Sequence, residues 1–338
     1  MRILVIRFSS LGDVVLASAP LCALAAAHPA AEILMATKRE YAPLFDNFPA
    51  WLTVIPYDPT QSVAAYRDSL GAGSYDLIVD LHGSLRSRLV TSRMKFKEKR
   101  RVDKQNVHRW RMVWSKKGLD EPISVVESYL KATGAPGNFL PQLFLSENEK
   151  SSVAEQTRNS QNLIGIGWGA KHPTKTVPFD LWSRLIHEIS EHTSVQVEIF
   201  GLRSDEPAIK QFIHDELTDL QVISVEPIIG LPLRETMTRI SACRAFLTSD
   251  SGLMHVADAL GVPTFGLFGP THPALGFTPA GIKSQAFHAG TWCSPCHRHG
   301  SAPCFRERRF CFDELNVHAI AAAVASPLQD SDHVPQSQ

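Results

Sequence analysis

The sequence predicts an α/β protein of two Rossmann-like halves, each with a parallel sheet, that bind ligand between them. Three observations lead to this prediction. Strand and helix patterns alternate along nearly the whole chain, the alternation runs twice, and a polar stretch at 146–162 separates the two runs. A chain of 338 residues is also too long for one ordinary hydrophobic core and long enough to form two domains. The G-x-G-x-x-G fingerprint follows the first strand of neither half, which argues against a dehydrogenase.

The first half begins with an apolar run at 1–7, which suits a central parallel strand. A turn at 8–12 follows, and Asp13 then opens a helix, where its carboxylate can act as the N-cap. Pro20 lies inside this helical pattern and should kink or restart the helix. Gly134 should end a later helix at 125–133. The remaining expected strands are 32–36, 52–56 and 75–81, and the remaining helical stretches are 41–45 and 62–70.

The second half repeats this architecture after the polar stretch, in which we place the domain boundary. The expected domains are 1–155 and 156–326, and the tail at 327–338 is too polar to pack and is expected to be disordered. The expected strands are 163–168, 195–200, 221–225, 245–247 and 264–268, and the expected helices are 179–191, 206–216, 233–243, 253–260 and 316–325.

The stretch 248–271 reads as strand, turn, helix and strand. An apolar run enters a small polar turn at Asp250, Ser251 and Gly252, and the following helix carries His255 and ends at Gly261. Such a turn directs free backbone N–H groups and a helix dipole at whatever lies above the strand ends, where anions are favoured. The sequence therefore predicts a phosphate-binding turn here.

A second candidate for phosphate binding is the loop after the strand at 163–168. Gly169, Ala170, Lys171 and Lys175 occur there. Glycine permits close backbone approach, and lysine supplies positive charge without a metal. Locally, a plain surface loop explains the same residues equally well.

A one-sided basic segment begins beside the loop at 80–84, at the carboxyl end of a strand where open α/β sheets place ligands. From 86 to 117 there are thirteen Lys and Arg against two acids, Glu98 and Asp103. A solvated face is one interpretation. Trp110 and Trp114 interleave the charges, which also suits an anionic partner with apolar parts. Nucleic acid is not expected, because the net charge of the chain is zero.

Composition and cysteine usage indicate a soluble protein of a reducing compartment. No apolar run approaches the roughly 20 residues that span a bilayer, and Arg7, Gly12 and Asp13 interrupt the only stretch that resembles a secretion signal. Cys293, Cys296, Cys304 and Cys311 have the spacing C-x2-C-x7-C-x6-C. They are either free thiols or ligands of a structural Zn or Fe, which four protein ligands would leave without an open position for catalysis.

Together these pieces resemble glycosyltransferase family 9, the ADP-heptose:lipopolysaccharide heptosyltransferases. The family adopts the GT-B fold, in which two Rossmann-like domains with parallel sheets face each other across a cleft and usually close over ligand. The resemblance covers nearly the whole chain. Its carriers are R-F-S-S-L-G-D at 7–13, D-L-H-G with R-S at 80–87, Gly169 and Ala170 with Lys175 and Pro178, and D-S-G-x-x-H at 250–255 running on to G-P-T at 269–271.

The resemblance implies an inverting, metal-independent transfer of a heptose or related sugar from an ADP-sugar to the lipopolysaccharide inner core. Asp13 would be the general base. A helix N-terminus lowers a carboxylate pKa, so this role would rely on proximity more than on a matched pKa. The implied donor-binding residues are Gly169, Ala170, Lys171, Lys175, Asp205 or Glu206 at the ribose, Leu231 near the purine, Asp250, Ser251, Gly252 and His255; the implied acceptor-binding residues are Ser10, Gly12, His82, Arg86, Arg100 and Arg101.

Such an enzyme is expected in the cytoplasm, peripheral at the inner-membrane surface, because its acceptor is anionic and lipid-anchored. The second hypothesis is a non-catalytic nucleotide- or RNA-binding protein that uses the basic segment and a four-cysteine metal knuckle. The two differ in one property, since only the first transfers a sugar.

Overall fold

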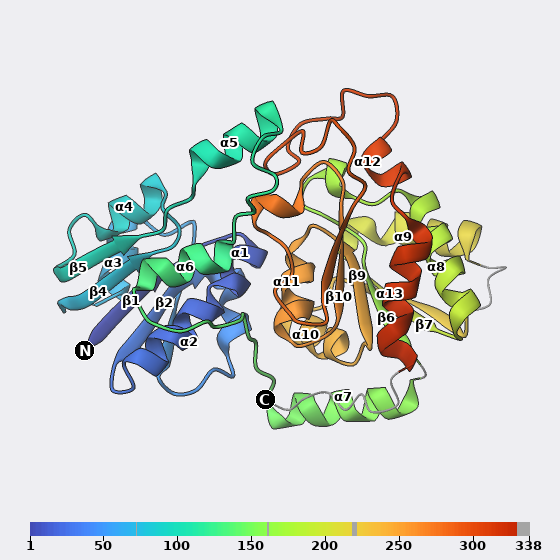
Figure 1. The fold of residues 1–338 in the computed structure, drawn as a ribbon. Helices are drawn as coiled ribbons and strands as arrows, with labels where there is room; N and C mark the ends of the chain where they lie inside the picture. The colour runs from blue at the N-terminus through green and yellow to red at the C-terminus, as the bar shows by residue number, and fades with distance from the viewer. Residues whose placement is uncertain (72, 161, 218–221, 330–338) are drawn as a thin grey trace. The chain divides into compact units, whose positions relative to one another are not determined.

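The computed structural model describes residues 1–71, 73–160, 162–217 and 222–329. They form two compact units (Figure 1). The first comprises Met1–Lys104 and Val125–Phe144, and the second comprises Gln105–Ser124 and the chain from Leu145 onward. Each unit contains one sheet, and every strand pair in both sheets is parallel, as the alternation of strand and helix predicts.

The sheet of the first unit has the strand order β3-β2-β1-β4-β5. The apolar run at the start of the chain forms its central strand, in which Ile3 pairs with Ile33 on one side and Leu77 on the other. The strand β5, of sequence FKEKRR, has no apolar run and was not expected. It is an edge strand, and its exposed charges discourage further pairing. The strands are β1 (Arg2–Ile6), β2 (Glu32–Lys38), β3 (Leu52–Tyr57), β4 (Tyr75–Asp80) and β5 (Phe96–Arg101).

Helices cover both faces of this sheet, with α2 packed on α6 and α3 packed on α4. The expected restart at Pro20 is confirmed, because the helix breaks at Ala17 and Pro20 falls in the first turn of the next one, where its missing N–H is least costly. Gly134 follows α6 with a φ of +66°. The helices are α1 (Leu11–Leu16), α2 (Ser18–Ala27), η1 (Arg39–Phe45, a 3₁₀ helix), α3 (Val63–Ser69), α4 (Leu85–Thr91) and α6 (Val125–Thr133).

The expectation that Asp13 is an N-cap is wrong. Ser10 is the N-cap of α1, and Asp13 lies three residues further on. Its carboxylate accepts the backbone N–H of Ser10 at 3.2 Å, the reverse half of a capping box. The carboxylate therefore still stabilises the start of α1, but from inside its first turn.

The sheet of the second unit has the strand order β11-β10-β9-β6-β7-β8. In Figure 1, α10 and α11 lie on one face of this sheet, and α8 and α13 lie on the other. The expected run of strand, turn, helix and strand at 248–271 is confirmed as β9, α11 and β10. The strands are β6 (Leu163–Gly167), β7 (Gln196–Gly201), β8 (Ser224–Ile229), β9 (Ala245–Ser249), β10 (Thr264–Phe268) and β11 (Gln285–His288), the last of which was not expected. Residue 221, where the third strand was expected to begin, lies outside the described residues.

The core of the second unit surrounds Trp182 and Phe312, which are completely buried. It explains the amphipathic pattern of α8, whose buried positions are Leu181, Trp182, Leu185, Ile186 and Ile189. The helices of this unit are α5 (Asn106–Ser115), α7 (Glu147–Asn159), η2 (Pro173–Lys175), α8 (Phe179–His192), η3 (Arg203–Asp205), α9 (Glu206–Glu216), α10 (Leu233–Ser241), α11 (Gly252–Ala259), η4 (Pro273–Leu275), α12 (Phe310–Asp313) and α13 (Val317–Gln329).

The two units divide the chain differently from the expected domains. The polar stretch at 146–162 is no linker, because it begins with the helix α7, which Glu149 ties to Arg234 of α10 at 2.8 Å. The segment 105–124 belongs with the second unit, where Asn106 of α5 accepts a hydrogen bond from Arg298 at 3.0 Å.

The expected tail starts too early. Helix α13 continues to Gln329, and Leu328 is buried against the core, so 327–329 are not disordered. The rest of the expected tail, 330–338, lies outside the described residues. No helix within the described residues has the length and apolarity needed to cross a bilayer.

Candidate active site

A buried ion pair stands at the carboxyl end of β1 in the first unit. The Nη2 of Arg7 lies 2.6 Å from the Oδ2 of Asp13, and the two side chains are only 10% and 15% exposed. The hydroxyl of Ser10 donates to the same oxygen at 2.8 Å. The phenol of Tyr129 donates to the other oxygen, Oδ1, at 3.2 Å. Donors from the turn between β1 and α1 and from α6 therefore converge on one carboxylate.

These donors determine the protonation state of Asp13. Burial raises the pKa of a carboxyl group, but here the charge of Arg7 and the hydrogen bonds from Ser10 outweigh it and hold the pKa of Asp13 below its usual value. Asp13 is thus ionised at neutral pH and can accept a proton. Its lowered pKa makes it a weak base, so proton transfer to it from a substrate hydroxyl would rely on close placement of that hydroxyl.

The loop after β4 is organised by Asp80, which is completely buried. Its carboxylate accepts the backbone N–H of Gly83 at 2.7 Å and the hydroxyl of Ser87 at 2.9 Å. The backbone of His82 also donates to it, at 3.1 Å. This arrangement joins β4 to α4 and presents the His82 side chain.

His82 is neutral. Burial, together with the charges of Arg7 and Lys104, lowers its pKa to about 4. Its ring packs edge-on against Phe8, and its Nδ1 is buried without a hydrogen-bond partner among the described residues. A buried ring nitrogen without a partner is costly, so a ligand that supplies one would be favoured here.

The structure places His82 and Arg86 around one open hollow of about 560 Å³ in the first unit. Its other lining residues are Val63, Ser84, Leu85 and Leu89. The predicted acceptor residue Arg101 lies next to this loop, because its guanidinium donates to the carbonyl of Gly83. Gly12 and Ser10 belong to the start of α1, beside Asp13.

Arg100 lies apart from these residues. Neighbouring residues of a strand face opposite sides of the sheet. The guanidinium of Arg100 accordingly pairs with Glu98 at 2.6 Å and donates to the carbonyl of Thr133 at the end of α6. These contacts are those of a structural residue, and its predicted role in acceptor binding is untested.

In the second unit, the turn between β9 and α11 is tied to the neighbouring strand ends. Thr248 donates to the carbonyl of Gly167 at 3.2 Å and shares a hydrogen bond with Ser251 at 3.0 Å. Gly167 is required, because a Cβ there would lie 2.5 Å from the Thr248 hydroxyl. Ser251 is the N-cap residue of α11, and Gly252 begins the helix, so the free N–H groups of its first turn lie at this point.

Lys175 and Asp250, both predicted from the sequence, come together at this turn. The Nζ of Lys175 lies 2.6 Å from the Oδ2 of Asp250 and donates to the Asp250 carbonyl at 3.0 Å. The hydroxyl of Thr271 also donates to this carboxylate, at 2.8 Å. Asp250 therefore holds the ammonium group of Lys175 beside the N-terminus of α11. An anion at this point would be attracted both to the ammonium group and to the helix N-terminus.

Two further predicted donor residues are adjacent in the structure. A Cβ at Gly169 would lie 3.0 Å from the carboxylate of Asp205, which itself accepts the backbone N–H of Leu202 at 2.9 Å. Glu206 instead pairs with Lys210 at 2.7 Å, and its side chain is 42% exposed. Between the two acids considered for the ribose, the local geometry favours Asp205.

The remaining predicted donor residues differ in their surroundings. His255 is buried, with its ring 6.4 Å from that of Phe277. Leu231 is about a third exposed and follows Gly230, which has a φ of +61°. Lys171 is exposed and Ala170 half-buried in the loop after β6. Burial lowers the pKa of His172, and the positive charges of Lys175 and Lys171 lower it further.

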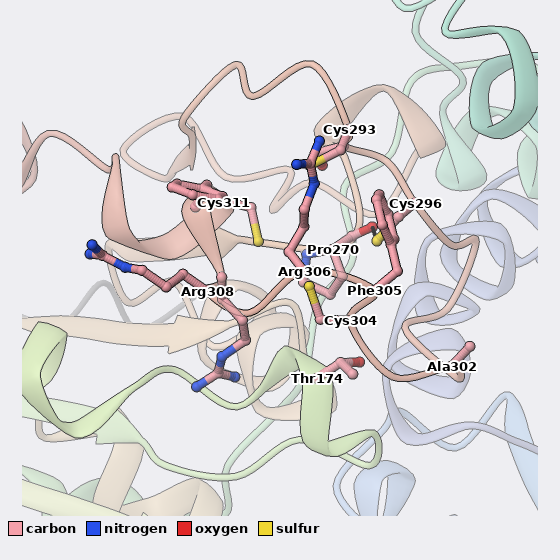
Figure 2. Close-up of a pocket in the computed structure, with 13 residues that line it drawn as sticks. Thr174, Pro270, Cys293, Cys296, Ala302, Cys304, Phe305, Arg306, Arg308 and Cys311 are labelled. Carbon is pink, nitrogen blue, oxygen red and sulfur yellow. Dashed lines mark hydrogen bonds between the residues drawn. The ribbon is translucent and has the colours of Figure 1, made fainter.

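The four clustered cysteines line one small cavity in the second unit (Figure 2). Its volume of about 20 Å³ has room for about one water-sized guest. Burial and the neighbouring thiols raise the pKa of Cys311 to about 12. No three of the four sulfurs, however, lie within 4.8 Å of one another. The only group of three metal-binding side chains that meets this distance in the described part of the chain is Glu188, His192 and His318, on the surface.

The segment 292–310, which we call the cysteine loop, also supports the predicted phosphate-binding turn. Ser294 donates to the carbonyl of Gly269 at 2.8 Å, and the backbone of Cys296 donates to that of Pro270 at 3.0 Å. Arg309 donates at 2.7 Å to the carbonyl of Thr176, in the loop after β6 that carries Lys171 and Lys175. The loop thus holds both segments that carry the predicted donor residues.

Three residues that the sequence did not assign to either cluster join them in the fold. Tyr129 and Lys104 join the Asp13 side, and Thr271 joins Asp250. Tyr129 lies 116 positions from Asp13 in the chain. No local pattern marks such a residue, although G-P-T at 269–271 did include Thr271 in the quoted motif.

The two clusters have complementary chemistry. The first unit offers an ionised carboxylate beside a hollow lined by a neutral histidine and an arginine. The second offers a lysine and a helix N-terminus suited to phosphate. Together they have the parts of a transfer reaction, namely a base for a hydroxyl and positive charge for an anionic leaving group.

Comparison with known proteins identifies the family. The model of "Glycosyltransferase family 9 (heptosyltransferase)" matches residues 63–303. Lipopolysaccharide heptosyltransferase 2 of Escherichia coli K12 is 35% identical over 142 residues, which are 41% of this chain and 40% of that protein. The chain thus matches about two fifths of the length of that relative.

Two other similarities extend over nearly the full length. Lipopolysaccharide heptosyltransferase 1 of Pseudomonas aeruginosa is 25% identical over 97% of this chain and 98% of its own. The structure of E. coli ADP-heptose lps heptosyltransferase II has a TM-score of 0.71 at 24% identity, covering 97% of this chain and 98% of that one, and confirms the GT-B-like fold. Because the family model alone matches well over half of the residues, the chain belongs to glycosyltransferase family 9, the heptosyltransferase family.

Proposed function

We propose that this protein transfers a heptose, or a related sugar, from an ADP-sugar to an acceptor in the lipopolysaccharide inner core, with inversion at the anomeric carbon. The observation on which this depends is the ionised, four-donor carboxylate of Asp13 in a chain of this family. The names of its relatives support the sugar and the acceptor class.

In the proposed reaction, an acceptor hydroxyl attacks the anomeric carbon of the donor and loses its proton to Asp13. The bond from that carbon to the diphosphate oxygen breaks, and its electron pair leaves with ADP. Arg7 and Tyr129 hold the carboxylate in place, so the base is positioned before the acceptor arrives.

On the donor side, negative charge develops on the departing diphosphate. Lys175 and the N–H groups at the start of α11 are the proposed stabilisers, with Lys175 transferring part of its hydrogen bonding from Asp250 to phosphate. We propose that no catalytic metal takes part, because these groups supply the positive charge and no Asp-x-Asp motif occurs near either cluster.

A structural Zn or Fe at the four cysteines is part of the same proposal. Four thiols on one cavity of suitable size support it. The sulfurs would have to approach one another to bind a single ion, and a bound cation would lower the raised pKa values of Cys296 and Cys311. The metal would stabilise the loop that holds Gly269 and Thr176.

The test is sugar transfer by purified protein. ADP-heptose, ADP-glucose and UDP-glucose would be offered with a deacylated, water-soluble inner-core oligosaccharide, and product would be measured by mass spectrometry under single-turnover conditions. We expect transfer only from ADP-heptose or a close relative. A protein that transfers no sugar but retains RNA in a salt-sensitive way would instead be the nucleotide- or RNA-binding protein of the second hypothesis.

A further inference from the structure

The exposed tryptophans of this protein are concentrated in one region of the second unit. The chain has six tryptophans. Trp168 and Trp182 are buried, and Trp51 is half-buried. The other three, Trp110, Trp114 and Trp292, are 48%, 79% and 71% exposed. All three belong to α5 or to the loop 292–310, which we call the aromatic-basic surface.

Helix α5 has two apolar faces, and only one is covered. Met112 and Val113 pack into a small core with Ile123, Ala274 and Leu275. Val107, Trp110 and Trp114 lie three and four residues apart on another face, where Val107 is 85% exposed. The inner face therefore fixes the helix on the unit, while the outer face presents apolar side chains to solvent.

The loop 292–310 continues this surface. Arg298 donates to the side chain of Asn106 at 3.0 Å, and its guanidinium lies 5.4 Å from the ring of Trp110. The guanidinium of Arg306 lies 4.3 Å from the ring of Trp292 and 5.3 Å from that of Phe305, which is 66% exposed. Helix and loop thus alternate exposed rings with guanidinium groups.

The charge of this surface has one sign. Residues 105–117 and 292–310 contain one acid, Glu307. Against it stand seven basic residues that are at least partly exposed, namely Arg111, Lys116, Lys117, Arg298, Arg306, Arg308 and Arg309, while Arg109 is buried. The net charge of the whole chain is zero, so this excess is local.

We infer that the aromatic-basic surface docks this protein on an anionic phospholipid bilayer. Tryptophan is the side chain that accumulates at the membrane interface, and arginine and lysine beside it are attracted to anionic headgroups. Val107 and Phe305 add apolar area that can enter the headgroup boundary. A nucleic acid would stack on the same rings, but it usually requires a broad basic field, which a chain of zero net charge lacks.

This inference goes beyond the proposed function, because bilayer binding requires no sugar transfer. It would place the enzyme at the surface where a lipid-anchored acceptor is found. The donor-binding and acceptor-binding residues are not part of the aromatic-basic surface.

The experiment is co-sedimentation of the full chain with vesicles of phosphatidylcholine alone and of phosphatidylcholine with about a third phosphatidylglycerol. We expect binding to the anionic vesicles, weakening as salt rises from low to physiological strength. The double variant Trp110→Ala/Trp114→Ala should bind at least about tenfold more weakly, because interfacial affinity follows buried apolar area. The matched control Ile223→Ala/Ile282→Ala removes two exposed side chains elsewhere and should bind like the wild type.

The contribution of charge is tested separately with the double variant Arg111→Gln/Lys117→Gln. Its matched control, Arg184→Gln/Lys210→Gln, removes the same charge from α8 and α9. Only the first pair should reduce binding to anionic vesicles. Unchanged ADP affinity in every variant would show that each is folded. Quenching of tryptophan fluorescence by brominated lipid should be lost when Trp110, Trp114 and Trp292 are replaced.

Equal binding to neutral and anionic vesicles, equal loss in the control variants, or preferential binding of an RNA oligonucleotide would overturn the inference. Transfer to the soluble acceptor separates this inference from the proposed function. Failed vesicle binding with intact transfer refutes only the docking surface, and vesicle binding without any transfer refutes only the enzyme.

Discussion

Replacing Asp13 by asparagine tests both the proposed base and its surroundings. Asparagine has nearly the same shape, but it is uncharged and one of its two terminal groups donates. The amide can accept from Ser10 or from Tyr129 but cannot accept from all the donors that surround Asp13. The variant therefore loses the base and leaves a buried guanidinium, that of Arg7, without its counter-charge.

Two magnitudes follow. Removal of a general base lowers kcat by about 10²- to 10⁴-fold, or roughly 3–5 kcal/mol of activation free energy. Breaking a buried ion pair costs about 3 kcal/mol of unfolding free energy, and somewhat less here because Arg7 keeps its hydrogen bond to the Leu81 carbonyl at 2.7 Å. Affinity for ADP should stay unchanged, since every predicted donor residue lies in the other unit.

The pH dependence gives an independent check. The folded-state pKa of Asp13 is lowered, so its stabilisation is fully present above the ordinary aspartate pKa of 3.8 and is lost as pH falls through the folded value. The difference in unfolding free energy between wild type and variant should thus be constant at neutral pH and shrink only below about 3.8.

The assay combines single-turnover transfer, isothermal titration with ADP and urea unfolding from pH 3 to 8. The exposed Asp46→Asn is the control for one lost carboxylate in the same unit. If Asp13→Asn keeps more than a tenth of wild-type kcat, Asp13 is not the base. A stability gap that persists unchanged at pH 3 would refute the electrostatic account of the ion pair.

Three further predictions concern the second unit. Lys175→Met should weaken ADP binding about tenfold or more, as expected for loss of a charged hydrogen bond, and unchanged affinity in titration calorimetry would remove Lys175 from the diphosphate site. Burial raises the pKa of Glu198 to about 7, so the folded chain still holds a proton that the unfolded chain releases near pH 4.5. The free energy of unfolding should therefore fall, by at most about 3 kcal/mol, as pH rises from 4.5 to 7. Glu198→Gln should abolish that slope in urea unfolding at pH 5 and 8, and a slope that survives would contradict the assignment. Purified protein should contain about one equivalent of Zn or Fe by elemental analysis, reduced in Cys304→Ser and Cys311→Ser; less than about half an equivalent in wild type would exclude the structural metal.

Most strands and helices could be predicted because each follows from its own residues. The strand 264–268 and the helices 125–133 and 206–216 match residue for residue, since an apolar run or an amphipathic pattern is bounded there by glycine or proline. Two of the unexpected elements share one cause. β5 and α7 lack apolar runs, and packing or strand pairing provides what their composition does not, although Ser146 and Glu149 already have capping-box spacing.

The sequence by itself determined most of the order of strands and helices and the turn at 250–255, and it placed Asp13 near the start of α1 but at the wrong position, the N-cap. These are local properties, because backbone preference and hydrophobic period act over a few residues. Only the tertiary structure decided that Tyr129 reaches Asp13, that Lys175 and Thr271 meet at Asp250, and that α5 packs with the cysteine loop. Those contacts join residues far apart in the chain, and their positions depend on how whole elements pack, which no short pattern encodes.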